Sequence, residues 1–567
     1  MSAPFSRPAG PDLSRVHELP LEQRVLAPIL RERARIDRDR VYLRFGTRAW
    51  TFGETEALVW RLARGWRRLG IEKGERIGLF MTNRPEFVFS WFAANLVGGV
   101  TVPINAGFTP ALLDYVLVDA GARALVTTRD LLPVVASLPA ARRALLRAIV
   151  VIDPRADARD GHPPDSPGSD GIGTVVEFEA LAATSGSEDP EVALDFRDTH
   201  SIMYTSGTTG PSKGAIVPNG HYFSASCTFL RAVDLQREDI LFTPLPLFHG
   251  VASRLGALPC LLVGAEYVLA PRFSASRFWQ QVTECRATVA HTIFTLPALL
   301  KGQPPGPWDR AHRLRAMYNS NHDPEFEQRF NVRLCEAYGL TEVGLTHYTR
   351  FPERRPGSCG RTHEDWDAAV VDARGLPVAD GETGEIVLRP RLPSIMMDGY
   401  INKPAETLRA TRDLWFHTGD YGRRDSEGYF YFVSRAKERI RRRGENISPS
   451  EVEMIVGGHP AVADCAALAH PARDGEDDVR IVIVARDPAA PPAPPALMDW
   501  LQAKMPYFMM PRYIEFAAAL PRNPAGKIEK YKLLDAGLAP DAWDREAAGH
   551  VIRRGTTPRH STDQETS

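Results

Sequence analysis

The densest group of residues able to do chemistry is a run of hydroxyl, glycine and lysine side chains, Tyr204-Thr-Ser-Gly-Thr-Thr-Gly-Pro-Ser-Lys-Gly-Ala215. Glycines let backbone N–H groups approach an anion closely, hydroxyls add hydrogen-bond donors, and the lysine adds positive charge. The spacing is not that of a Walker A loop, because Lys213 is preceded by Ser212 and followed by Gly214. The run predicts a polyphosphate-binding loop, and the alternative is a small polar loop that binds no ligand.

Further segments place ionisable residues in short motifs. Each residue has an ordinary interpretation when taken alone: Glu342 as a solvated loop acid, Asp420 as a turn residue, and Lys527 as a surface lysine. His249, in Pro244-Leu-Pro-Leu-Phe-His249, could equally be a core or loop histidine. The other segments are Tyr338-Gly-Leu-Thr-Glu342, His417-Thr-Gly-Asp420, Arg435 through Arg443-Gly-Glu-Asn-Ile-Ser-Pro449, and Pro521-Arg-Asn-Pro-Ala-Gly-Lys527.

Length and charge restrict the classes of protein that could carry these motifs. A chain of 567 residues predicts at least two structural units. Its 69 Lys and Arg residues against 70 Asp and Glu residues give a net charge of -1, which supplies no overall field to hold nucleic acid or an anionic membrane. Any polyanion must therefore be bound locally.

Cysteine usage and the amino terminus indicate the compartment. The six cysteines are scattered, without a CxxC pair or zinc-type spacing, which favours a reducing, cytosolic compartment. The amino terminus lacks the apolar core of a signal peptide. Residues 87–113 are uncharged and long enough to span a bilayer, but serine, asparagine, glycine and proline interrupt them, so we expect a buried helix, strand and turn instead of a membrane span. We expect a cytoplasmic protein.

Alternating helical and strand patterns must position the motifs. Residues 54–69 carry apolar side chains at spacings of three and four and end at Gly70, which predicts an amphipathic helix. A strand at 76–81 and a helix at 85–96 follow. Further elements are expected as strands at 100–103, 124–127 and 148–152 and a helix from Pro110. This alternation indicates βαβ units, a mostly parallel buried sheet and an α/β fold.

Composition changes suggest the domain boundaries. Residues 153–172 are rich in Asp, Pro and Gly and predict an exposed, mobile connection. The chain becomes strand-rich after Asp367, and a basic run at 435–443 precedes a smaller α/β unit. The expected organisation is an N-terminal domain over 1–434, a C-terminal domain over 435–540 with a polyproline-type spacer at 488–496, and a disordered tail over 541–567.

In this order, the motifs resemble those of the adenylate-forming (ANL) superfamily of acyl-CoA synthetases, luciferases and peptide-synthetase adenylation domains. The resemblance covers residues 51–534, and motifs in register are far more specific together than singly. It implies a large N-terminal AMP-binding domain of several α/β layers with a β-rich subdomain, and a small, mobile C-terminal α+β domain. It also implies an AMP-forming acid–thiol ligase, in which a carboxylate and ATP give acyl-AMP and pyrophosphate, and CoA then takes the acyl group.

The resemblance implies roles for individual residues on the nucleotide side. Thr341 would contact the α-phosphate, Glu342 would bind Mg²⁺, and Lys527 would be the catalytic lysine that bridges the carboxylate and the α-phosphate. Asp420 would accept hydrogen bonds from both ribose hydroxyls, with help from Arg435. The ATP- and AMP-binding residues so implied are Thr205, Ser206, Gly207, Thr208, Thr209, Gly210, Lys213, Tyr338, Gly339, Thr341, Asp420 and Arg435.

On the acyl and CoA side, the resemblance places His249 between the acyl pocket and the adenylate. Gly444 would line the pantetheine tunnel, where a side chain would obstruct the thiol. Glu438 occupies the hinge about which the C-terminal domain would rotate, because Lys527 must leave before pantetheine enters. Arg443 stands where the family usually has glycine, and this departure bears on the detailed shape of the pantetheine tunnel.

The motifs do not identify the carboxylic acid that would be the substrate. The stretch Tyr318-Asn-Ser-Asn-His-Asp-Pro324 departs from the Gly-Gly-Ala-Pro-like sequence usual beside the adenine. This departure, together with residues 273–289, resembles the crotonobetaine/carnitine-CoA ligase branch, a likeness that does not by itself establish the substrate.

The implied partners are a small carboxylic acid, ATP and CoA, with a homodimer left open. Nucleic acid is not favoured as the ligand of the basic run, because the apolar Ile440 and the motif after it match the family's hinge. Two alternatives remain. One is an adenylation enzyme that loads a carrier-protein phosphopantetheine, and the other is a nucleotide-binding scaffold that no longer catalyses.

Overall fold

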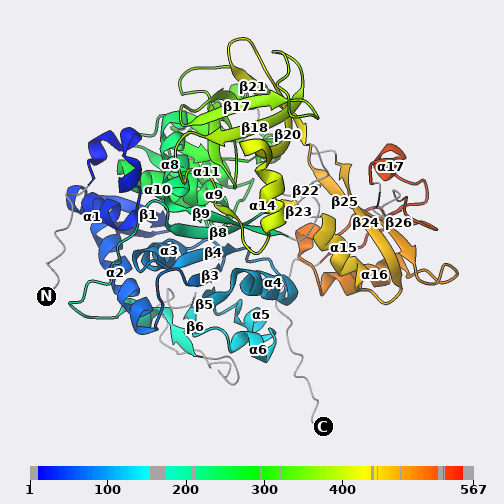
Figure 1. Cartoon of the computed structure of the whole chain (residues 1–567), viewed down its shortest axis with the longest axis horizontal. Helices are drawn as coiled ribbons and strands as arrows, with labels where there is room; N and C mark the ends of the chain where they lie inside the picture. Colours follow the sequence, from blue (N-terminus) through cyan, green and yellow to red (C-terminus); the bar gives the residue numbers. More distant parts are fainter. Residues whose placement is uncertain are drawn as a thin grey trace, which may run out of the picture.

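A computed structural model describes residues 11–153, 174–205, 212–293, 296–319, 322–435, 440–442, 445–447, 449–472, 475–521, 528 and 530–552. The connection expected at 153–172 lies outside these residues, except for Asp153. Figure 1 shows a large domain, drawn from blue to yellow-green, beside a small domain formed by the last part of the chain. Mixed sheets with helices make up both, as the α/β expectation requires.

The first sheet holds the amino-terminal βαβ units. Its strand order is β19-β9-β8-β4-β3-β5-β6-β7, and its central strands are parallel. In the antiparallel pair β8–β9, Thr205 lies opposite Lys213, so the glycine-rich run connects these two strands. The strands are β3 (Arg76–Phe80), β4 (Val100–Ile104), β5 (Ala122–Thr128), β6 (Ala148–Ile152), β7 (Val175–Glu177), β8 (Thr199–Thr205), β9 (Lys213–Pro218) and β19 (Gly399–Tyr400).

The second sheet has a parallel half and an antiparallel half. Its order is β17-β18-β20-β21-β16-β15-β14-β13-β12-β10-β11-β1-β2, and the pairing changes from parallel to antiparallel after β14. The antiparallel half includes the strand-rich region expected after Asp367, together with β15 and β16, which precede it in the chain. The strands are β1 (Val41–Phe45), β2 (Arg48–Thr51), β10 (Ile240–Thr243), β11 (Glu266–Leu269), β12 (Val289–His291), β13 (Ala316–Asn319), β14 (Arg333–Leu340), β15 (Gly344–Tyr348), β16 (Gly360–Thr362), β17 (Trp366–Val371), β18 (Gly384–Pro390), β20 (Phe416–Arg424) and β21 (Tyr429–Arg435).

Helices cover these sheets, and local sequence explains where they begin. A capping box formed by Thr51 and Glu54 starts α2, and Pro85 occupies the first turn of α3, where its missing N–H costs nothing. Every residue of α3 is buried, which fits its place in the core between the layers. The helices of the large domain are α1 (Leu26–Ile36), α2 (Phe52–Arg68), α3 (Pro85–Leu96), α4 (Pro110–Ala120), α5 (Leu132–Ala136), α6 (Ala140–Arg143), α7 (Phe178–Ala182), α8 (Asn219–Val233), α9 (Gly250–Ala252), α10 (Leu258–Val263), α11 (Phe278–Glu284), α12 (Leu296–Lys301), α13 (Pro324–Phe330) and α14 (Pro404–Ala410).

The small domain has a hairpin and a four-stranded sheet with two differently covered faces. Ile481 and Ile483 of β25 share a core with the hairpin and with Leu112 of the large domain, whereas Val482 faces the other way and packs near Ile528. The elements are β22 (Ile440–Arg442), β23 (Glu445–Ile447), α15 (Pro449–Gly457), β24 (Val462–Pro471), β25 (Asp477–Ala485), α16 (Pro494–Gln502), β26 (Tyr513–Phe516), α17 (Lys530–Asp535) and β27 (Trp543–Asp544). The described strands up to residue 435 and those from residue 440 occupy separate sheets.

Two expectations need correction. The tail does not begin at Asp541, because Trp543–Asp544 pair with β26 and Trp543 packs against the core of the small domain. The polyproline-type spacer ends earlier than expected, because Pro494 and Pro495 start α16, where proline is tolerated. Among the described residues, no helix is both long enough and apolar enough to cross a membrane.

Candidate active site

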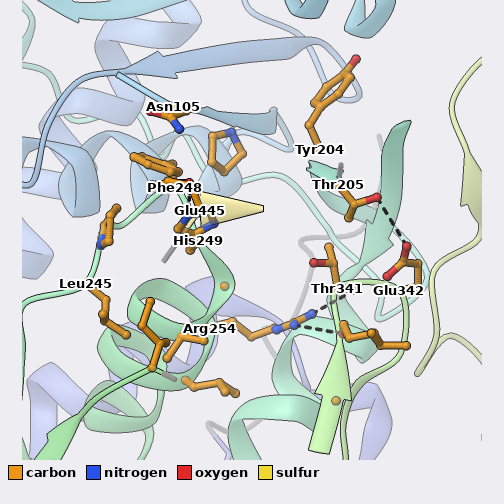
Figure 2. A pocket seen from close by; sticks show the side chains of 18 of the residues that line it. Asn105, Tyr204, Thr205, Leu245, Phe248, His249, Arg254, Thr341, Glu342 and Glu445 are labelled. Carbon is orange, nitrogen blue, oxygen red and sulfur yellow. Dashed lines mark hydrogen bonds and ion pairs between the residues drawn. The ribbon is translucent and has the colours of Figure 1, made fainter. Parts of the chain in front are cut away.

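A cavity of about 360 Å³ opens where carboxyl ends of parallel strands from both sheets meet. Ile104 ends β4, Thr205 ends β8 and Tyr318 lies in β13, and all three line the cavity. The carboxyl edge of a parallel sheet is the usual position of a ligand site in α/β proteins. The small domain closes the cavity with Glu445, which Figure 2 shows beside His249.

Glu342 joins the predicted phosphate loop to the second motif. Its Oε1 accepts a hydrogen bond from the hydroxyl of Tyr400 at 2.8 Å and another from the hydroxyl of Thr205 at 3.4 Å. The Nζ of Lys213 lies 4.6 Å from the centre of the Tyr400 ring. Burial lowers the pKa of Lys213, and the negative charge of Glu342 opposes that shift. Thr205, at one end of the glycine-rich run, thus contacts Glu342 directly, whereas Lys213, at the other end, lies on the Tyr400 ring and feels the charge of Glu342.

A single carboxylate at this place fits a magnesium ion. No group of three or more His, Cys, Asp and Glu side chains in the described part of the chain could hold a metal by itself. Mg²⁺ is usually bound through one or two carboxylates together with substrate phosphates, and does not need a complete protein cage. The oxygens of Glu342, Thr205 and Tyr400 are of the hard type that this ion prefers.

Asp420 is the second anchoring acid. It is buried, and its Oδ2 accepts a hydrogen bond from the hydroxyl of Tyr338 at 2.8 Å. The register of β20 and β21 places the backbone of Asp420 opposite that of Arg435. A carboxylate held in this way is a strong acceptor for the hydroxyls of a ligand.

His249 and Glu445 connect the two domains across the cavity. The Nε2 of His249 lies 3.1 Å from the Oε2 of Glu445 in β23, and the ring of Phe248 lies 4.5 Å from the His249 ring. Both side chains line the cavity. The hairpin of the small domain therefore faces the position assigned to the acyl group.

A second contact between the domains joins Ser212 to Glu451. The backbone N–H of Ser212 donates to Oε1 of Glu451 at 3.0 Å, and the Ser212 hydroxyl donates to the same oxygen. Tyr115 in turn donates to the carbonyl oxygen of Ser212 at 2.7 Å. Burial raises the pKa of the Glu451 carboxyl above its ordinary value of 4.5, and the hydrogen bonds from Ser212 oppose this rise. The small domain thus places an acid against the end of the predicted phosphate loop.

This contact is expected to weaken as the pH rises. A carboxyl whose pKa is raised in the contact stabilises it fully below pH 4.5, and the contribution is lost as the pH rises through the raised value. We predict that Glu451→Gln removes this dependence and leaves the domains closer together at about pH 8 than in the wild type. The distance between the domains would be measured at each pH by energy transfer between dyes attached to Leu376→Cys and Phe516→Cys, two exposed positions on different domains.

The matched control for this prediction is Glu325→Gln, which changes an exposed acid away from the cavity. It should keep the pH dependence of the wild type. A wild-type signal that does not change with pH, or an equal slope in Glu451→Gln, would contradict the prediction.

The structure places most, but not all, of the predicted site residues. Lys213 lies beside the cavity, and the backbone of Arg435 pairs with Asp420. Those that line the cavity are Thr205, His249, Tyr338, Gly339, Thr341, Glu342 and Asp420. Those that lie outside the described residues are Ser206, Gly207, Thr208, Thr209, Gly210, Glu438, Gly444 and Lys527.

Four side chains at the site are absent from the sequence-based prediction. Arg254 could have been noticed in the sequence, because it is the only charged residue between Gly250 and Gly264. Glu445 belongs to the motif at 443–449, although the resemblance gave it no role. Tyr400 and Glu451 reach the site through contacts between distant segments.

The chain is similar to known proteins over most of its length. A family profile described as AMP-binding enzyme matches residues 30–401, and one described as AMP-binding enzyme C-terminal domain matches residues 451–527. A crotonobetaine/carnitine–CoA ligase of Proteus mirabilis (strain HI4320) is 31% identical over 494 residues, which are 86% of this chain and 93% of that protein.

Two solved structures share the fold over nearly all of their length. The anthranilate CoA ligase AuaEII, in complex with anthranoyl-AMP, is 25% identical with a TM-score of 0.67, over 92% of this chain and 98% of that chain. An o-succinylbenzoate CoA synthetase from Bacillus subtilis, bound with a product analogue, is 24% identical with a TM-score of 0.75, over 89% of this chain and 98% of that chain.

Proposed function

This chain belongs to the AMP-binding enzyme family, and we propose that it is an ATP-dependent acyl-CoA synthetase that works through an acyl-adenylate. Its relatives and fold support an enzyme of the acyl-CoA ligase type. The observation that carries the proposed reaction is that Thr205, Thr341, Glu342 and Asp420, from three motifs dispersed along the chain, line one cavity.

In the first half-reaction, an oxygen of the carboxylate attacks the α-phosphorus of ATP, and pyrophosphate leaves. Negative charge builds on the phosphate oxygens during this step and must be met by donors and cations. Thr341 would donate to the α-phosphate, and the loop that ends at Lys213 would hold the phosphates. Asp420 would fix the ribose through two hydrogen bonds, and Glu342 would hold Mg²⁺. When bound there, this ion neutralises charge on the phosphate oxygens.

In the second half-reaction, the thiol of CoA attacks the acyl carbon and AMP leaves. The position of the small domain supports this assignment, because its hairpin residue Glu445 lines the cavity while Ile528 packs on the opposite face of the β24–β25 pair. Lys527 precedes Ile528 in the chain. We propose that adenylation uses a second pose, in which a rotation about Glu438 turns the face that carries Ile528 to the cavity and Lys527 acts on the α-phosphate.

The acceptor of the acyl group and the identity of the carboxylic acid substrate are not determined by the nucleotide site. A carrier-protein phosphopantetheine is the alternative acceptor, and a scaffold without catalysis is the alternative to an enzyme. The Proteus mirabilis relative is named for crotonobetaine and carnitine. These compounds carry a fixed positive charge, which the buried cation Arg254 in the cavity wall would repel.

The test is acid-dependent release of pyrophosphate over a panel of carboxylic acids, with and without CoA. We expect release with at least one acid and an acyl-CoA product when CoA is present. Adenylation without thioester formation would indicate a carrier acceptor. No release with any acid would favour the scaffold.

A third prediction concerns the ribose anchor. Asp420→Asn keeps the size of the side chain but removes its charge, and one of its two terminal atoms becomes a donor. Because hydrogen bonds to a charged group are worth about 1.5–3 kcal/mol each, KM for ATP should rise about 10- to 100-fold while KM for the acid changes little. Initial-rate measurements with each substrate varied in turn would check this.

Tyr338→Phe serves as the comparison, because it removes the hydroxyl that donates to Asp420 and keeps the carboxylate. Its effect on KM for ATP should be smaller than that of Asp420→Asn. An unchanged KM for ATP in Asp420→Asn would refute the ribose assignment.

A further inference from the structure

Arg254 is a buried cation in the wall of the candidate active site. It lies in the π-helical turn η3 (Ser253–Ala257), is 6% exposed and lines the cavity. Figure 2 shows its side chain extending toward Thr341 on the side of the cavity that also holds Leu245. The nucleotide anchors described above do not include this residue.

The described residues satisfy the guanidinium of Arg254 poorly. Its Nη1 donates to the carbonyl oxygen of Thr341 at 3.3 Å, and its Nη2 donates to that of Leu340 at 3.5 Å, both longer than an ordinary hydrogen bond. Its Nε is buried and has no hydrogen-bond partner among the described residues. A guanidinium has five N–H donors, so the described part of the chain leaves most of its hydrogen-bonding capacity unused.

The neighbouring His221 does not change this conclusion. Its Nε2 lies 2.9 Å from the carbonyl oxygen of Thr341, which can only accept, so Nε2 carries the hydrogen. The same nitrogen, 3.4 Å from Nη1 of Arg254, therefore has no lone pair to offer it. Burial, with a contribution from the charge of Arg254, lowers the pKa of His221 to about 3, so the ring is neutral.

No described carboxylate compensates the charge of Arg254 at close range. Burial lowers its pKa, and the charge of Glu342 is the smallest of the effects that oppose this. Glu342 is also the residue assigned to Mg²⁺. A buried cation without a paired anion is costly to the folded protein, so a ligand that supplies the anion would bind there strongly.

Taking the proposed function as given, we propose that Arg254 binds a second anionic group of the acid, and that the substrates are dicarboxylic acids activated at one end. The activated carboxylate would lie near Thr341 and His249, and the other would form a charge-assisted, two-pronged hydrogen bond with the guanidinium. Apolar residues of the same cavity, among them Leu245, Leu255 and Ile293, would contact the carbon chain between them.

The test compares acids that differ only in their far end. Dicarboxylic acids from succinate to suberate, and terephthalate, are compared with monocarboxylic acids of equal length, with benzoate, and with ω-trimethylammonio acids. The wild-type kcat/KM for pyrophosphate release should favour the best dicarboxylic acid by about 100-fold or more over its monocarboxylic counterpart. The trimethylammonio acids should be the poorest substrates because their cation would be repelled.

Arg254→Met should reverse the preference. Its kcat/KM for the dicarboxylic acid should fall by about 100-fold, while that for the monocarboxylic acid should stay or rise. Arg254→Lys should keep part of the preference, because it retains the charge without the planar fork. In thermal unfolding, Arg254→Met should be no less stable than the wild type, and a dicarboxylic acid with ATP should raise Tm of the wild type more than Tm of the variant.

Arg44→Met is the control, since it removes a half-exposed arginine that pairs with Glu266 at 2.5 Å, away from the cavity. It should keep the wild-type preference. The inference is overturned if the wild type prefers monocarboxylic acids, or if Arg254→Met lowers kcat/KM for both classes equally, and in either case the synthetase activity itself stands. Absence of activity with every acid would overturn the proposed function as well.

Discussion

Lys527→Ala is expected to lower the rate of acyl-adenylate formation by about 1,000-fold and to leave thioester formation from supplied acyl-AMP close to the wild-type rate. The reason is that the lysine cation would bridge the carboxylate and the α-phosphate only while charge develops between them. We propose that the second half-reaction uses the described pose, in which Glu445 lines the cavity and Ile528 packs in a separate cluster of the small domain. The two rates are measured separately, as pyrophosphate release from acid and ATP and as acyl-CoA formation from synthetic acyl-AMP.

Lys504→Ala provides the matched control, because Lys504 is an exposed lysine of the same domain that packs on the ring of Trp500. Both half-reactions should continue at the wild-type rate in this variant. An equal loss of both rates in Lys527→Ala would remove the lysine from its assigned role and would indicate a structural defect instead.

Gly444→Leu is expected to have the opposite effect, with adenylation retained and thioester formation lowered by at least about 100-fold. Residues 443 and 444 connect β22 to β23, in which Arg442 pairs with Glu445 and Glu445 lines the cavity. A side chain at position 444 would enter the path of the pantetheine thiol if that path passes the hairpin. Single-turnover conversion of preformed acyl-AMP to acyl-CoA would measure the loss directly.

Gly457→Leu tests whether the effect is specific to the hairpin. Gly457 ends α15, and a side chain there would meet open space, so both rates should remain unchanged. If thioester formation in Gly444→Leu kept the wild-type rate, or if adenylation fell in parallel, the pantetheine path would have to lie elsewhere. Together the two variants at positions 527 and 444 separate the half-reactions in opposite directions.

The elements were predictable where local sequence determines them. The helix at 85–96 was predicted with its observed bounds, because Pro85 marks its first turn and its residues are almost uniformly apolar. The strands at 76–81, 100–103 and 148–152 were predicted within one residue at either end, since short apolar runs bounded by turn residues are typical of a parallel sheet. Trp543 was assigned to a disordered tail because its surroundings are polar, and only its contacts with a distant core order it.

The candidate site was predictable only where a local sequence motif marks its residues. Thr205, Glu342 and Asp420 belong to motifs that can be recognised in sequence, although their meeting in one cavity is a property of the fold. The contact of Glu451 with Ser212 depends on how two domains dock, which no local pattern encodes. Arg254 stands out in sequence as a charge within an apolar run. That its side chain is buried in the cavity wall, without a described carboxylate to pair with, is visible only in the structure.

The central claim, an acyl-adenylate formed at this cavity, is tested most directly by isotope transfer. Acid labelled with ¹⁸O in both carboxylate oxygens is incubated with the enzyme, ATP, Mg²⁺ and CoA, and the AMP is examined by mass spectrometry. Because a carboxylate oxygen bonds to the α-phosphorus and stays there when the thiol takes the acyl group, we predict one ¹⁸O atom in the phosphate of AMP. AMP without label, or label recovered in inorganic phosphate together with ADP, would contradict the claim.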